Sequence, residues 1–332
     1  KLFTGNGGTQ SITGVGFQPD WVWFKNRTTA GNNHLLYDAV RGATKRIQSS
    51  SASAEATDSN GLTSFDSDGF SIGNKGSLNE NSANIVAWNW KANGQGSSNT
   101  DGTINTTYTS ANTTSGVSII KYTGNGSNAT VGHGLGVAPK MDIQKVLDAA
   151  NDSMGGHNGL HATAAWDRYI YLNGSSAVAD ANTMWNDTYP TTTTVSLGTH
   201  SYVNYSGRDY IMYAFAEKKG FSKMGSYQGI ANNDGTFVYT GFKPAFVMTK
   251  NIDASENWSM FDSKRNTSNV VNKELFVNLS NAENTQNICD FVSNGFKFRH
   301  QDGRYHNANE FVYAAFAEAP LVGSNNVPCT AR

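Results

Sequence analysis

The chain repeats one short apolar phrase. Two clear copies read IMYAFAEKK at residues 211–219 and VYAAFAEAP at residues 312–320. In each copy apolar side chains stand at alternate positions, which is the pattern of a β-strand that turns one face toward a core. VAWNW at residues 86–90 is a third, more distant copy. A strand that recurs in this way predicts that one structural module is used three times.

A second set of repeats shows where each module begins. An aromatic residue followed by Thr-Gly-Asn-Gly starts at Phe3 and at Tyr122, and a weaker form starts at Tyr227. Each start is followed by a Gly-x-x-Pro corner, and a lysine stands six residues after each proline. The prolines are Pro19, Pro139 and Pro244, and the lysines are Lys25, Lys145 and Lys250.

These repeats divide the chain into three modules, a linker and a tail. The linker is almost entirely Gly, Ser, Thr and Asn, with little that could enter a core, so we expect a flexible connection or a long surface excursion. No comparable spacer precedes the third module, which predicts that the second and third modules pack together while the first sits apart. The predicted divisions are module 1 at 1–92, the linker at 93–118, module 2 at 119–224, module 3 at 225–320 and the tail at 321–332.

The composition favours strands and turns over helices. Asp, Glu, Lys and Arg make up 15% of the residues, against roughly 25% in typical domains. Asn-Gly and Asp-Gly pairs recur along the chain, and such pairs supply the positive φ angles that tight hairpins need. We therefore predict an all-β protein built from three tandem antiparallel β-sandwich modules of jelly-roll or lectin-like type.

Charge and hydropathy argue against two classes of partner. The formal net charge is −1, whereas nucleic-acid binding depends on clustered Lys and Arg, so we expect no nucleic-acid partner. No apolar run approaches the roughly 18 residues needed to span a bilayer, so we expect no membrane insertion. Cys289 and Cys329 could form a disulfide, but Cys329 lies in the polar tail and two independent thiols are the favoured interpretation.

Sequence motifs give no support for catalysis. The chain contains no Gly-x-Ser-x-Gly elbow, no Walker loop and no dinucleotide fingerprint. His157 and His161 stand four residues apart, but the glycines around them disfavour a helix that would place both on one face. We predict a protein without catalytic residues and without a cofactor.

One weak metal candidate is the pair Asp66 and Asp68 in the sequence DSDG. Alternating carboxylates resemble the start of a calcium loop, yet the later ligands of such a loop are missing. A hairpin turn with Asp side chains is therefore favoured over calcium binding. A related phrase, an aromatic residue followed by Asp-x-x-Arg, occurs at 37–41 and 261–265 and predicts an ion pair that ties a loop.

Three tryptophans are the candidate ligand-binding residues. Trp166, Trp185 and Trp258 lie in polar surroundings and could stack on a sugar ring, as exposed aromatic residues on β-sandwiches can. Partial burial is favoured over ligand stacking. Trp21, Trp23, Trp88 and Trp90 lie in strand patterns and are predicted to belong to the core.

Several longer phrases together resemble a known family. They include TGNGGTQSITGVGFQPDWVWFKNR, LTSFDSDGFSIG, FAEKKGFSKMGSY and VYTGFKPAFVMTKN, in this order along nearly the whole chain. The chain resembles repeat-bearing structural proteins of tailed bacteriophages, especially marine ones. One departure is MDIQK at residues 141–145, where the family has a purely apolar strand. Asp142 and Gln144 put the burial or the central position of that strand in doubt.

The resemblance implies a non-enzymatic virion protein, most simply a tail-fibre or appendage component that attaches to the host surface. Its implied partners are other virion proteins, further copies of the chain in a homo-oligomer, and a glycan or protein of the host surface. Its implied location is the virion, and the chain is expected to be part of a protein that is longer at the N-terminus. A capsid-decorating or head-fibre protein is the alternative, and a glycan-degrading spike is a more distant one.

Overall fold

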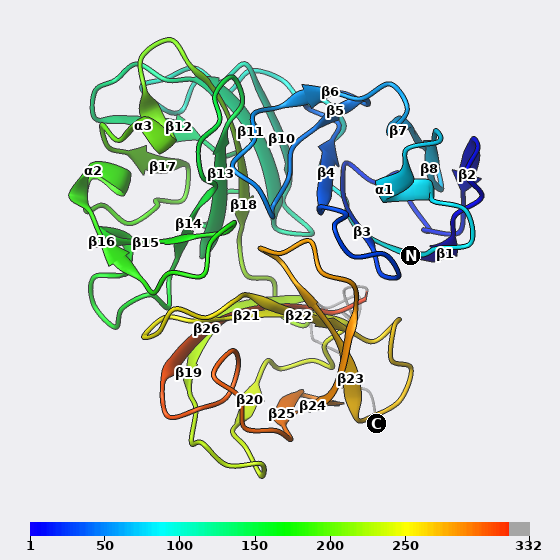
Figure 1. The fold of residues 1–332 in the computed structure, drawn as a ribbon. Coiled ribbons are helices and arrows are strands. Elements are labelled where there is room, and N and C mark those ends of the chain that lie inside the picture. Colours follow the sequence, from blue (N-terminus) through cyan, green and yellow to red (C-terminus); the bar gives the residue numbers. More distant parts are fainter. Residues whose placement is uncertain (319–332) are drawn as a thin grey trace.

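The computed structural model describes residues 1–318, and antiparallel sheets make up almost all of their regular structure (Figure 1). The prediction of an all-β protein is confirmed. Helices in this part of the chain are single turns. They are α1 (Gly76–Asn79), α2 (Asn182–Trp185), α3 (Ser201–Asn204) and the 3₁₀ turn η1 (Ala165–Asp167).

The strands fall into three groups that pair only within themselves, and we call these groups the N-terminal, middle and C-terminal units. In the N-terminal unit one sheet has the order β1-β9-β3-β4, a second has the order β2-β8-β7, and β5 pairs with β6. Its strands are β1 (Leu2–Thr4), β2 (Gln10–Ile12), β3 (Trp21–Asn26), β4 (Leu35–Asp38), β5 (Lys45–Arg46), β6 (Ala56–Thr57), β7 (Leu62–Asp66), β8 (Gly69–Ile72) and β9 (Asn84–Trp90).

The middle unit contains a seven-stranded sheet with the order β10-β11-β18-β13-β14-β15-β16 and the separate pair β12-β17. Its strands are β10 (Tyr108–Asn112), β11 (Val117–Thr123), β12 (Ala129–Gly132), β13 (Met141–Val146), β14 (Met154–His157), β15 (Arg168–Tyr171), β16 (Ala179–Asp180), β17 (Thr194–Leu197) and β18 (Asp209–Phe215).

The C-terminal unit is one eight-stranded sheet with the order β19-β26-β21-β22-β23-β24-β25-β20. The sheet curls, so that the two end strands approach each other and the Lys223 ammonium of β19 donates a hydrogen bond to the Tyr239 carbonyl of β20 at 3.1 Å. Its strands are β19 (Ser222–Gln228), β20 (Phe237–Tyr239), β21 (Phe246–Asn251), β22 (Ser259–Asp262), β23 (Val271–Phe276), β24 (Asn284–Val292), β25 (Gly295–Phe298) and β26 (Glu310–Phe316).

The repeated phrases occupy the same place in each unit. They form β9, β18 and β26. Each of these strands lies between β1, β11 or β19 on one side and the strand that follows the proline corner on the other. Alternate residues of the corner strands enter two different cores. In β3, Trp21 and Trp23 face a core shared by all three units, while Val22 and Phe24 face the interior of the N-terminal unit.

The expectation of a linker at residues 93–118 is wrong for much of this segment. Residues 108–112 form β10, which pairs with β11 along five residues. Ile104 is 8% exposed and enters the core of the middle unit, and its backbone N–H bonds to the Thr130 carbonyl. The polar composition does not keep this segment out of the fold, because its hydroxyl groups form hydrogen bonds there. Thr106 and Thr109, for example, form a buried hydroxyl pair at 2.8 Å.

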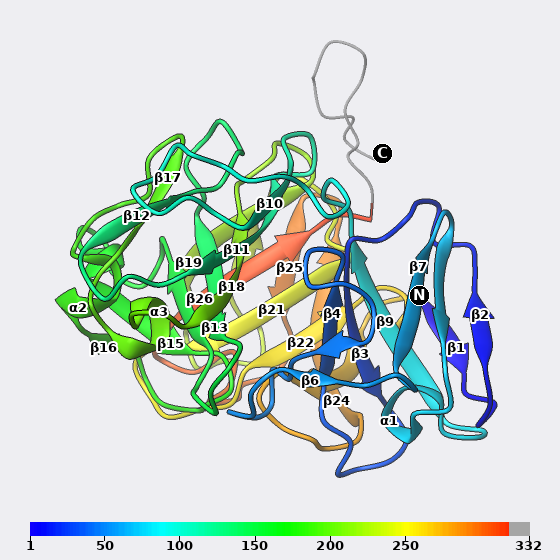
Figure 2. The ribbon, with the colours of Figure 1, turned by 90° about the horizontal axis from the view of Figure 1, so that it is seen from above.

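The expectation that the first module sits apart is also wrong. The strands of the N-terminal unit in blue, the middle unit in green and the C-terminal unit in yellow to red converge on a common centre (Figures 1 and 2). One continuous apolar cluster draws residues from all three units. The spacer is therefore folded onto the middle unit and does not separate two bodies.

Limited proteolysis checks the placement of the former linker. Thermolysin cleaves before apolar residues, and a buried site is cut only when the segment opens locally. We expect the native protein to resist cleavage before Ile104 under conditions that cut the urea-unfolded protein there, as read by mass spectrometry of the fragments. Rapid native cleavage at this site, giving two stable pieces, would contradict the observed packing.

Candidate functional site

The three tryptophans considered as ligand-stacking residues are buried, as the favoured interpretation expects, and the candidate stacking role is excluded. Trp166 and Trp185 are fully buried in the middle unit, where their rings meet edge to face with centroids 5.6 Å apart. Trp258 is 2% exposed, and its indole N–H donates to the Tyr171 carbonyl at 2.8 Å. Trp166 and Trp185 lie in the single turns η1 and α2, whose polar neighbours face outward while the rings point inward.

Asp66 and Asp68 lie at the β7–β8 hairpin, but their carboxylates accept hydrogen bonds from different partners. The Asp66 carboxylate accepts from the hydroxyls of Ser64 and Ser71 at 2.8 and 2.7 Å. Asp68 accepts the backbone N–H groups of Gly16 and Gly14 at 2.6 and 2.8 Å, and these bonds lower the pKa of its carboxyl. These contacts match the hairpin turn with Asp side chains that the sequence favours over calcium binding.

Within residues 1–318, no three His, Cys, Asp or Glu side chains gather closely enough to hold a metal ion. His157 is buried and His161 is exposed, so the two do not share a site. Cys289 is buried, which raises the pKa of its thiol, whereas Cys329 lies outside the described residues, as does the tail at 321–332. None of the helices in the described part of the chain has the length and apolar character to cross a bilayer.

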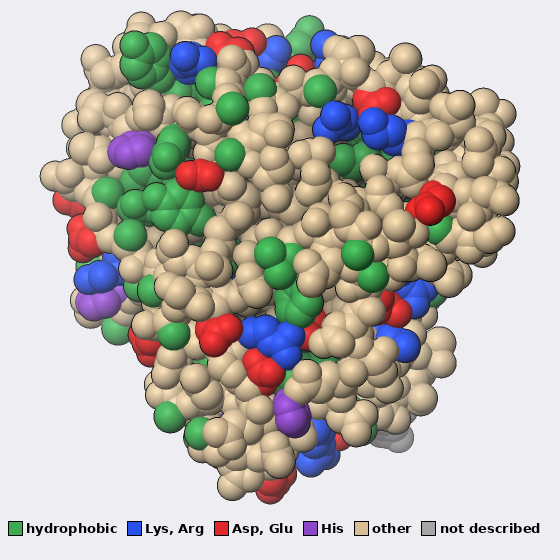
Figure 3. Space-filling view, viewed as in Figure 1, with side chains coloured by type: hydrophobic (Ala, Val, Ile, Leu, Met, Phe, Trp, Pro, Cys, Tyr) green, Lys and Arg blue, Asp and Glu red, His purple; other side chains and the backbone are tan. Residues whose placement is uncertain are grey.

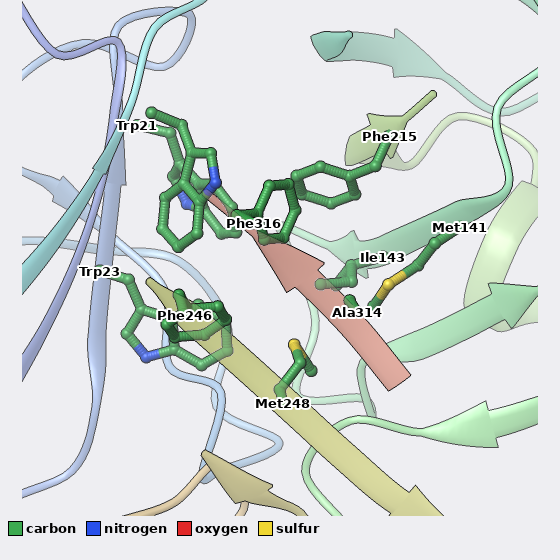
Figure 4. Close-up of a pocket in the computed structure, with 10 residues that line it drawn as sticks. Trp21, Trp23, Met141, Ile143, Phe215, Phe246, Met248, Ala314 and Phe316 are labelled. Carbon is green, nitrogen blue, oxygen red and sulfur yellow. The ribbon is translucent and has the colours of Figure 1, made fainter. Parts of the chain in front are cut away.

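The centre of the molecule is the site that the three units build together. Equivalent strand pairs supply it, because β3 pairs with β9, β13 with β18 and β21 with β26. Figure 4 shows their side chains pointing toward one another, and the void left between them is about 10 Å³, too small for a ligand. The directly opposed pairs are Trp21 with Trp90, Met141 with Phe215, and Phe246 with Phe316.

The repeated lysines link the units in a cycle. Each is fully buried at the edge of the core, and its ammonium donates to a backbone carbonyl of a neighbouring unit. Burial lowers the pKa of each of the three to about 8. The bonds run from Lys25 to Ser280 of the C-terminal unit at 3.1 Å, from Lys145 to Ala52 of the N-terminal unit at 2.8 Å, and from Lys250 to Ser175 of the middle unit at 3.1 Å.

Backbone hydrogen bonds repeat the same cycle. In each unit, the carbonyl two residues after the lysine accepts a backbone N–H from the neighbouring unit. The donor stands three residues after the carbonyl that the lysine binds. These bonds are Glu283 to Arg27 at 2.9 Å, Glu55 to Leu147 at 2.8 Å, and Val178 to Ile252 at 3.0 Å. Each interface thus pairs the same positions of two units, which gives the molecule an approximate threefold arrangement.

A second cycle is built from the predicted Asp-x-x-Arg phrases, and the expected ion pairs are confirmed. Asp38 with Arg41 and Asp262 with Arg265 each join at 2.5 Å in buried positions. Burial alone would raise the pKa of Asp262, but Arg265 and the hydrogen bonds around the carboxylate lower it. Each carboxylate also accepts from another unit: Tyr213 Oη donates to Asp38 at 2.7 Å, and Trp88 Nε1 donates to Asp262 at 3.0 Å.

The third interface, between the middle and C-terminal units, keeps a hydrogen bond at this place, but the donor and acceptor sides are exchanged. In β26, Ala314 stands where the other units have Trp88 and Tyr213, so that position offers no side-chain donor. The facing residue is His157 in place of an aspartate, and its Nε2 lies 3.1 Å from the Tyr313 carbonyl. Burial lowers the pKa of His157 to about 4, and Nδ1 accepts the Gly159 N–H, so the neutral ring donates from Nε2.

Asp142 and Gln144 neither place β13 at an edge nor expose it, which removes the doubt about this strand. The strand lies between β14 and β18, and all six of its residues are buried. Asp142 accepts the Gly156 N–H at 2.8 Å and the Gln144 amide at 3.2 Å, and Gln144 accepts the Tyr122 hydroxyl at 3.0 Å. Burial raises the pKa of Asp142 to about 7, with no cation among the causes.

A family model described as a domain of unknown function, DUF7483, matches residues 1–320, so the chain belongs to this family. The match runs through all three units without a break. No curated protein and no solved structure gave a significant match.

Truncating the centre of the shared core should weaken the whole molecule. Phe316 is 6% exposed and contacts aromatic rings of all three units, so Phe316→Ala should lower the free energy of unfolding by about 3–5 kcal/mol. Urea unfolding followed by tryptophan fluorescence measures it. Phe237→Ala, at a 43% exposed position, should cost only about 0.5 kcal/mol. A shared core would be contradicted if the two variants lost equal free energy of unfolding. It would also be contradicted if Phe316→Ala affected only one early step of a multi-step unfolding curve.

The buried Asp142 should make stability depend on pH. Its pKa is higher in the folded protein, so its contribution is present at low pH and is lost as pH rises from about 4 to about 7. The full change is about 4 kcal/mol. Urea unfolding across this range should therefore show a steeper loss in the wild type than in Asp142→Asn. Asp148→Asn, at an exposed position, is the control and should keep the wild-type slope; an unchanged slope in Asp142→Asn would contradict the assignment.

Proposed function

We propose that this member of the DUF7483 family is a non-enzymatic structural protein of a phage virion, acting in a tail fibre or similar appendage that attaches to the host surface. The observation that carries the proposal is the shared core with its two cycles of contacts between units. Every unit is held by both others, so force applied to one is passed to the whole body. That suits a load-bearing part.

We further infer that the units are copies of one antiparallel β-sandwich module of jelly-roll or lectin-like type. The support is positional. The repeated phrase, the lysine after the proline corner and the residues opposite them take the same register in each unit. In this proposal the three copies act as a single-chain counterpart of a symmetric trimer, and the complete chain assembles with further copies and with other virion proteins.

The surface supports attachment to a polar partner. On the face drawn in Figure 3 most of the surface belongs to uncharged polar side chains and backbone, and charged side chains occur in small groups. Large apolar side chains that are exposed in residues 1–318 are few. They are Val137, Tyr189, Tyr205, Ile230, Phe237 and Tyr239.

Immunogold labelling of intact virions tests the proposal. Antibody raised against residues 119–320 should place gold at the tail tip or along the fibres, because an attachment protein must be accessible there. Gold spread over the head would overturn host attachment and make the chain a capsid-decorating or head-fibre protein. Particles without gold, while the disrupted sample contains the antigen on a blot, would exclude a surface appendage.

A further inference from the structure

A groove lies at the open edge of the C-terminal unit, where the end strands β19 and β20 face each other. It encloses about 580 Å³, within the range of small-molecule sites. One wall is the stretch that enters β19, and the other is the end of β20. The lining that matters here is Lys218, Lys219, Lys223 and Tyr239, with Thr240 and Gly241 at the turn.

The aromatic residues at this edge have no aromatic counterpart in the other two units. Phe237 and Tyr239 point to the same face of β20 and are 43% and 58% exposed, while Val238 between them enters the core. The other two units provide an internal comparison, because β2 and β12 pair with their neighbours in the same register as β20. The positions equivalent to the two aromatics hold Ser11 and Thr13 in the N-terminal unit and Thr130 and Gly132 in the middle unit.

The groove also concentrates positive charge. The Lys223 ammonium lies 5.2 Å from the Tyr239 ring centroid, and Lys218 and Lys219 stand on the same wall. The equivalent of Lys223 in the middle unit is Ser118, so the middle unit lacks this charge. Glu217 is the one acidic residue of the lining, and one of its oxygens accepts the Met224 N–H at 2.9 Å.

We propose that this groove binds an anionic saccharide, a sugar that carries a carboxylate or sulfate group. The face of Tyr239 and the neighbouring Phe237 offer a surface on which the apolar face of a pyranose can stack. The lysine ammonium groups would pair with the acidic substituent, an interaction that salt screens because the groove is open to solvent. The proposal rests on the proposed attachment function, since it names the class of ligand that the attachment protein would recognise.

Isothermal titration of the full chain tests the groove. The probes are a galacturonic acid hexasaccharide for the carboxylate, a carrageenan hexasaccharide for the sulfate, and maltohexaose as the neutral control. We expect binding of at least one acidic probe, weakened by added salt, and no binding of maltohexaose. Which acidic probe binds distinguishes the two acid groups. Absence of binding by both, or equal binding of the neutral sugar, would overturn the proposal.

Matched variants locate the site. Tyr239→Ala and Lys223→Gln should each weaken binding roughly tenfold. The controls are Tyr205→Ala and Arg208→Gln in the middle unit, where a 53% exposed tyrosine also carries a cation over its ring, at 5.5 Å, but does not line the groove. Thermal unfolding confirms that each variant is folded, and Tyr239→Phe should retain binding by keeping the ring. Equal loss in the control pair, or none in the groove variants, would place the site elsewhere.

The two proposals fail in different ways. Saccharide binding that depends on Tyr239, together with immunogold on the phage head, would keep the groove and overturn tail attachment. Gold at the tail with unchanged binding in Tyr239→Ala would keep attachment and overturn the groove.

Discussion

The structure depends on the burial of one apolar sheet face from each unit against the other two. A strand such as β3 alternates between two cores, so its outer face would expose Trp21 and Trp23 if the N-terminal unit stood alone. Each unit has an interior of its own, but its remaining apolar face is covered only in the assembled chain. Units of this size bury a modest fraction of their surface by themselves, and the shared core supplies what each one lacks.

Polar groups at the rim of this core determine how the units meet. Fully buried lysines are costly unless their ammonium groups are hydrogen-bonded, and here each has carbonyl acceptors, one of them from a neighbouring unit. Separation of two units would leave those carbonyls without their donor, in addition to exposing the apolar faces. Apolar burial therefore supplies the attraction, while the lysines and the Asp-x-x-Arg pairs set the register.

The repeated motifs can be predicted from the sequence, but the residues that they contact in the neighbouring units cannot. Alternating apolar residues were enough to place β9, β18 and β26, and the Asp-x-x-Arg phrases were enough to predict the ion pairs. The spacing of Lys25, Lys145 and Lys250 was visible, but their partners lie far along the chain and share no motif. The complete burial of Trp166 and Trp185 could not be predicted, because their neighbours in sequence are polar and burial depends on the direction in which a single helical turn points the ring.

Because the three units occupy equivalent positions, each serves as a comparison for the others, and departures from the repeat fall into two physical kinds. His157 opposite the Tyr313 carbonyl belongs to the first kind, since a donor replaces an acceptor where the facing strand lacks a side-chain donor, and the contact survives. Phe237 and Tyr239 belong to the second kind, since they are aromatic residues at exposed positions where the other two units have small residues. A departure of the first kind preserves a contact between units, whereas one of the second kind adds exposed apolar surface beside an open groove. Exposed apolar surface beside a groove is typical of binding sites, which is why the C-terminal groove, and not the buried tryptophans, carries the proposal of a ligand site.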